Sequence, residues 1–153
     1  MVSNDMIPEI SHEGFQVVSG EMFKHMQRLS LPSATLWQNS ISFSKASIMA
    51  LNNCERVRIE VNTSTRCLLI VPVTLKDKDN IHWVKNIKDP TARKIECKAF
   101  TSQLFNAWGW KPDYVYRTTG RVVSVDKKVM LLFDFSEPES WLWKERMKAN
   151  GNA

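Results

Sequence analysis

The chain has 153 residues, of which 43% are hydrophobic, and this is the size of one domain with enough apolar material for a core. Its net charge of +5 permits binding to polyanions, and its three cysteines, without a Cys-x-x-Cys spacing, favour a reducing cytoplasmic setting. The longest apolar runs, CLLIVPV and VMLLF, are far shorter than the roughly 20 residues that span a bilayer, so a membrane-spanning protein is not expected.

Residues 1–36 are predicted to form an N-terminal arm and one helix. The first eighteen residues read as irregular chain that ends in the extended run FQVV. Ser19 can cap the segment EMFKHMQRL, whose apolar residues recur at helical spacing. We therefore expect a helix that packs against the core.

Residues 37–75 have the pattern of a β-α-β-β unit. Leu36, Ile41 and Phe43 indicate a strand, and KASIMALNN indicates a helix of about two turns. The helix is expected to end at the pair Asn52-Asn53, because asparagine tolerates left-handed backbone.

Two further strands of this unit form a predicted hairpin. Val57, Ile59 and Val61 alternate with polar residues, which is the period of a half-buried strand, and RCLLIVPV follows after the turn NTST. We expect Val61 opposite Arg66, which places the apolar side chains of both strands on one face. Arg56 and Arg58 then lie on the opposite face.

Residues 76–94 read as a charged insertion, and residues 95–135 repeat the earlier order of elements. Lys and Arg outnumber Asp and Glu by seven to four in residues 76–101. After the insertion come a short strand at Ile95 and Cys97, a helix SQLFNAWGW that ends at Gly109, and a second hairpin around SVDK.

Residues 136–153 are predicted to form a C-terminal helix. Ser136 and Glu139 have the spacing of a capping box, and a proline is allowed in the first turn. Trp141 and Trp143 cannot easily share one face of that helix.

Taken together, these elements predict a single α+β domain. Its two β-α-β-β units are expected to pack as a pseudo-dimeric small barrel, with an N-terminal and a C-terminal flanking helix. Diverged duplication would explain why the order of elements recurs.

Residues 41–73 resemble the AbrB-like swapped-hairpin module. The pattern I-x-F-x-K-A-x-x-x-A-L, a polar turn, V-x-I-x-V, a second turn and L-x-I-V-P carries the resemblance. Members of that family are small DNA-binding regulators and antitoxins in which two copies from two chains interleave into one barrel. The resemblance implies double-stranded DNA as a partner, and a homodimer or another protein partner is an alternative.

The whole chain resembles a group of uncharacterised bacterial mobile-element and prophage proteins that are often labelled integrase. The strings EGFQVV, RKIECKAF, YVYRTTGR and KVMLLFDF carry this likeness. Tyrosine recombinases need an arginine upstream of a His-x-x-Arg and a tyrosine nucleophile downstream. His25-Met26-Gln27-Arg28 matches the middle part, but no arginine precedes it, so we do not expect an enzyme.

Other catalytic and metal signals are weak in this sequence. The three histidines lie far apart, the cysteines do not cluster, and nucleotide-binding and hydrolase motifs are missing. We therefore expect neither a metal nor a cofactor. Cys97 is interpreted as a small buried residue, and Trp108 and Trp110 as structural.

Nucleic-acid binding by a non-enzymatic regulatory or accessory protein is the function that charge and resemblance favour together. Arginines can grip phosphates or guanine edges, and an exposed tryptophan can stack on a base. A solvated strand face and a merely soluble insertion are the plain alternatives for these cations, and Trp83 could equally be held in the core. Rival functions are a protein-interaction module and single-strand binding. The candidate residues are Lys45, Arg56, Arg58, Trp83, Lys85, Lys88, Arg93, Lys94, Arg117 and Arg121.

Overall fold

The computed structural model describes residues 7–20, 31–85 and 93–143 of the chain. The chain divides into two compact units, Met1–Ser30 and Leu31–Ala153. Within 7–20 every side chain is exposed, and the expected run FQVV is not part of a strand. The helix predicted over EMFKHMQRL falls on residues 21–30, outside the described residues.

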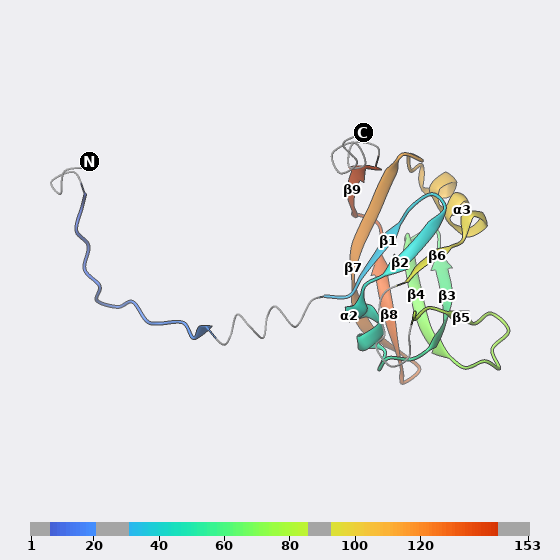
Figure 1. The fold of residues 1–153 in the computed structure, drawn as a ribbon, viewed down its shortest axis with the longest axis horizontal. Coiled ribbons are helices and arrows are strands. Elements are labelled where there is room, and N and C mark those ends of the chain that lie inside the picture. The colour runs from blue at the N-terminus through green and yellow to red at the C-terminus, as the bar shows by residue number, and fades with distance from the viewer. Residues whose placement is uncertain (1–6, 21–30, 86–92, 144–153) are drawn as a thin grey trace. The chain divides into compact units, whose positions relative to one another are not determined.

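Nine strands of the second unit form one antiparallel sheet among the described residues, in the order β5-β3-β4-β8-β7-β1-β2-β6, with β9 added beside β7. Helices α2 and α3 accompany it (Figure 1). The described part is therefore mostly antiparallel β, and its sheet curls into a half-barrel. The elements are β1 (Ser33–Leu36), β2 (Ser40–Phe43), α2 (Lys45–Ala50), β3 (Arg56–Asn62), β4 (Cys67–Val73), β5 (Ile81–His82), β6 (Lys94–Glu96), α3 (Lys98–Trp108), β7 (Tyr114–Val125), β8 (Lys128–Asp134) and β9 (Glu139–Leu142).

The long strand β7 belongs to both parts of the curled sheet. Its first half pairs with β1 and β9, and its second half pairs with β8. The change of partners occurs at Gly120, whose N–H donates to the Pro32 carbonyl at 2.8 Å and whose cross-strand partner is Phe133. A Cβ at position 120 would lie 2.6 Å from Phe133 Cε1. Glycine is thus required at this position, where the Phe133 ring lies directly against the backbone of β7.

The core lies inside the curl and is rich in aromatic side chains. Phe43 on β2 contacts Trp83, with ring centroids 5.4 Å apart, and Phe133 on β8, at 5.8 Å. All three are at most 1% exposed. Trp108 is also buried and donates its indole N–H to the Thr63 carbonyl, which confirms its structural interpretation.

Several local predictions are confirmed. Helix α2 ends before Asn52 and Asn53, and both have φ of 55°. Helix α3 ends at Gly109, which has φ of 66° and a left-handed conformation. A two-residue turn, Asp126-Lys127, closes the β7–β8 hairpin, with positive φ at both residues as a type I′ turn requires.

Two strand predictions differ from the structure. The segment read as one strand around Leu36 and Ile41 is a hairpin, because Trp37 and Ser40 exchange backbone hydrogen bonds and reverse the chain. In the β3–β4 hairpin, Val61 faces Leu68 and not Arg66. Arg66 belongs to the turn, with φ of 59°. Since the shift is two residues, each side chain stays on its predicted face.

The C-terminal helix is wrong over Glu139–Leu142, which form β9 antiparallel to β7. The Ser136 N–H donates to Asp134 Oδ1, and the Glu139 carboxylate accepts from Arg117 at 2.8 Å, so the expected capping box does not form. The rest of the predicted helix, residues 144–153, lies outside the described residues. None of the described helices is long and apolar enough to span a membrane.

Candidate functional site

The two outer strands of the sheet order, β5 and β6, approach each other across the open side of the curl. Arg93, directly before β6, donates from Nη1 to the carbonyl of His82 on β5 at 3.1 Å. Between them lies an open pocket of about 400 Å³, here called the basic pocket. The basic pocket is lined by His82, Val84, Lys85, Arg93 and Lys94.

The chain around β5 explains why these cations converge. Trp83 and Val84 are each 1% exposed and anchor the segment in the core. Lys85, which follows them, is exposed at the rim of the basic pocket.

Burial of Trp83 also corrects one expectation, because a ring enclosed by the core cannot stack on a base. Its Nε1 donates to the Cys54 carbonyl at 2.8 Å, so Trp83 is a structural anchor.

The basic pocket contains concentrated positive charge. None of its described lining residues carries a carboxylate. Glu55 lies beside the pocket, and its Oε1 is 3.4 Å from His82 Nε2 without forming a hydrogen bond. Like charges held together in this way repel one another and attract an anion. The pocket is therefore suited to a phosphate group.

Lys94 connects the basic pocket to a second hollow, the aromatic pocket, which has a volume of about 230 Å³. The Lys94 ammonium lies over the Trp37 ring, 4.4 Å from its centroid, in a cation–π contact. The aromatic pocket is lined by Trp37, Gln38, Asn39, Ser40, Lys94, Glu96, Pro112, Asp113, Tyr114, Val115 and Trp143.

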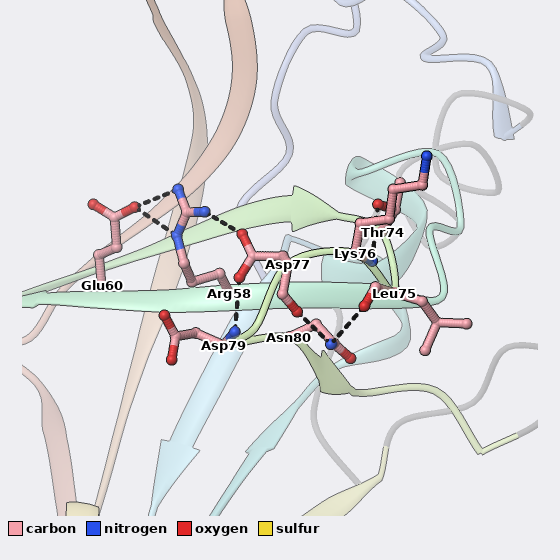
Figure 2. A network of polar contacts seen from close by, with 8 residues as sticks. All are labelled: Arg58, Glu60, Thr74, Leu75, Lys76, Asp77, Asp79 and Asn80. Atoms are coloured by element: carbon pink, nitrogen blue, oxygen red, sulfur yellow. Dashed lines mark hydrogen bonds and ion pairs between the residues drawn. The ribbon is translucent and has the colours of Figure 1, made fainter.

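The arginines of the first hairpin have polar partners within the protein. Figure 2 shows Arg58 between Glu60 and Asp77, with the closest contacts at 2.9 and 2.5 Å. Arg56 Nη1 donates to Asn80 Oδ1 at 2.7 Å. Arg56 is also the cross-strand partner of His82 in the β3–β5 pairing, so Arg56, unlike Arg58, lies beside the basic pocket.

The remaining predicted cations lie elsewhere. Arg117 forms an ion pair with Glu139 and lies over the Trp141 ring, 5.3 Å from its centroid. Arg121 is exposed on β7 near Asp134, whose pKa is lowered mainly by the Ser136 N–H and hydroxyl, with a smaller contribution from Arg121. Lys45 is exposed at the start of α2, and Lys88 lies outside the described residues.

No family model, curated protein or solved structure matches the chain. Of the predicted residues, the structure brings Lys85, Arg93 and Lys94 together, and it adds His82 and the aromatic pocket, which the sequence interpretation did not include. A signal for the turn at Trp37 was present, because the polar run Gln38-Asn39-Ser40 between two apolar segments indicates a break in the strand.

The described cysteine, histidine and acidic side chains suggest neither a nucleophile nor a metal centre. Burial raises the pKa of the Cys54 and Cys97 thiols, which keeps them protonated at neutral pH. Within residues 7–20, 31–85 and 93–143, no three of the side chains that commonly ligate metals are grouped to hold an ion.

The Arg58–Asp77 ion pair gives a testable pH dependence. The pKa of Asp77 is lowered first by the hydrogen bond from the Asp79 N–H and further by Arg58. A carboxyl with a lowered folded pKa stabilises the fold above its unfolded pKa of about 3.9 and loses this contribution as the pH falls through the folded value. The stability difference between the wild type and Arg58→Ala should therefore shrink between about pH 5 and pH 2.

Carbon NMR titration of the Asp77 carboxyl checks the cause directly. In Arg58→Ala the pKa should rise toward the ordinary range of an aspartate but stay below it, because the Asp79 N–H still donates. An unchanged pKa in that variant would show that the ion pair does not form in solution. Lys78→Ala removes an exposed cation next in sequence to Asp77 and should have a smaller effect.

Proposed function

We propose that the chain is a non-enzymatic nucleic-acid-binding accessory or regulatory protein of a mobile element, and that the basic pocket contacts the phosphate backbone of DNA. The observation that carries this proposal is the convergence of Lys85, Arg93 and Lys94 on one pocket whose described lining lacks a carboxylate. The hairpin arginines contribute less, because Arg58 and Arg117 already have acidic partners.

Phosphate contacts of this kind give affinity without sequence specificity. Each phosphate that a lysine or arginine neutralises releases condensed counterions, so the logarithm of the binding constant falls with the logarithm of salt concentration by about 0.9 per contact on duplex DNA. The basic pocket supplies three formal cations, with Arg56 beside it. The association with a mobile element stays a prediction from the resemblance.

The double variant Lys85→Ala/Arg93→Ala tests the proposal. Fluorescence anisotropy with a labelled duplex at several salt concentrations should show weaker binding and a salt slope that is smaller by about 2. Lys78→Ala/Lys128→Ala is the matched control, since it removes the same charge from exposed positions outside the basic pocket and should keep most of the slope.

Two outcomes would contradict the proposal. One is that the wild type binds neither duplex nor single-stranded DNA at low salt. The other is that the control variant loses as much affinity as the pocket variant, because binding would then depend on net charge and not on the basic pocket.

We also propose that the two β-α-β-β segments are diverged copies related by an approximate two-fold axis. The pairing of corresponding strands supports this idea. Strand β2 pairs with β6, with Ile41 opposite Ile95, and β4 pairs antiparallel with β8, with Leu69 opposite Leu132. Strand β1 lies beside β7 and precedes β2, and strand β5 lies beside β3 and precedes β6, so these two strands occupy equivalent places. An experimental structure in which no two-fold rotation superposes residues 40–73 on 94–134 would contradict the proposal.

A further inference from the structure

The aromatic pocket adjoins the basic pocket, and both share Lys94. We propose that the aromatic pocket takes one unpaired base of a nucleic-acid strand whose neighbouring phosphates bind the basic pocket. This inference rests on the proposed function and specifies its ligand as a strand with unpaired nucleotides.

Three rings line the aromatic pocket from separate elements. Trp37 is in the turn between β1 and β2, Tyr114 begins β7, and Trp143 directly follows β9. Trp143 is 42% exposed, so an indole surface is available to a ligand. Bases stack on such rings whatever their sequence, because every base has a π-face.

Two side-chain amides add groups that can recognise the edge of a base. The carbonyls of Gln38 and Asn39 accept hydrogen bonds from Thr101 Oγ1 and the Cys97 N–H, which fix the turn against the start of α3. The side-chain amides of both residues have no hydrogen-bond partner among the described residues. Amides can donate to and accept from the edges of bases.

The charges divide the two pockets between phosphate and base. Glu96 and Asp113 line the aromatic pocket and disfavour a phosphate there, whereas the basic pocket has no carboxylate in its described lining. The volume of about 230 Å³ is below the roughly 300 Å³ at which drug-sized pockets begin, so it suits one small planar group.

A cationic ligand in an aromatic cage fits these observations less well. The Lys94 ammonium already occupies the face of Trp37, at 4.4 Å from the ring centroid. A second cation at this ring would be repelled by the ammonium, while a neutral base can stack on the ring without that repulsion.

The test compares two labelled single strands of equal length and charge, oligothymidylate of eight nucleotides and eight abasic residues, by anisotropy at low salt. Wild type should bind the thymidylate strand about 5- to 150-fold more tightly, the range of one stacked base. Trp37→Ala should remove most of this excess, so that the ratio of the two affinities falls toward one. Trp37→Phe, which keeps a ring, should retain part of the excess and separates stacking from a folding defect.

The outcomes distinguish this inference from the proposed function. Equal binding of both strands by wild type, with Lys85→Ala/Arg93→Ala weakening both, would overturn the base site and leave the phosphate site standing. An excess for thymidylate that is unchanged in Trp37→Ala would overturn the aromatic pocket as its cause. Failure of wild type to bind either strand or duplex would overturn the proposed function and this inference together.

Discussion

Replacing Trp83 by alanine is expected to lower the free energy of unfolding by about 3–5 kcal/mol. Trp83 is 1% exposed and lies edge-on to Phe43, with centroids 5.4 Å apart. Removing the indole leaves a cavity between β2 and the segment after β5, and it also leaves the Cys54 carbonyl without its hydrogen bond. A loss of this size is a large part of the stability of an ordinary domain.

Urea denaturation followed by circular dichroism measures the effect, and two further variants isolate its causes. Trp83→Phe keeps a ring but loses the N–H donor. It should lower the free energy of unfolding less than Trp83→Ala does, but still measurably, because the buried Cys54 carbonyl stays without a hydrogen bond. Trp143→Ala is the matched control, since its side chain is 42% exposed. If Trp83→Ala cost no more than this control, the ring would not be part of the core in solution.

Gly120→Ala is expected to destabilise the protein by about 1–3 kcal/mol, the range for overpacking a core. The added methyl group would meet Phe133 at 2.6 Å from Cε1. The Phe133 ring cannot move aside freely, because it is fully buried and contacts Phe43. The strain therefore reaches both parts of the sheet that β7 joins.

A double-mutant cycle checks whether Phe133 is the cause. In the background Phe133→Leu, the same Gly120→Ala change should cost less, which gives a favourable coupling between the two positions. Gly20→Ala is the control, since no atom lies within 4 Å of an added Cβ there, and little change is expected. Additive costs at 120 and 133 would rule out the proposed clash.

Local patterns predicted much of the secondary structure. The alternation in Val57, Ile59 and Val61 identifies the inner face at Val57, which is fully buried, whereas Val61 near the end of the strand is 42% exposed. Left-handed residues follow both helices as expected. The register error at Arg66 arose because turn length depends on the backbone conformation of single residues, which periodicity does not report.

The C-terminal error has a different physical origin. The spacing of Ser136 and Glu139 satisfies a helix cap, but pairing with the exposed edge of β7 gives Glu139 an arginine partner instead. Tertiary pairing of this kind overrides local propensity. Trp141 and Trp143 are two residues apart, a spacing that places side chains on one face of a strand but not of a helix. This spacing was the signal in the sequence that favoured a strand.

The candidate site was predictable only as a set of residue types. Composition placed lysines and arginines near residues 76–101, but it could not indicate that Lys85 and Arg93 flank one pocket while Arg58 contacts Asp77. Whether a cation lines the pocket depends on which strands lie at the two ends of the sheet, and long-range strand pairing determines that order.

The same long-range pairing has a consequence during synthesis on the ribosome. Strands β1 and β4 each need a partner, β7 and β8 respectively, that is translated much later. Until then the apolar run CLLIVPV of β4 has an unpaired edge beside β3 alone. Folding of such a topology is slow, and the nascent first half is the stage at which this protein is most exposed to aggregation and to chaperone binding.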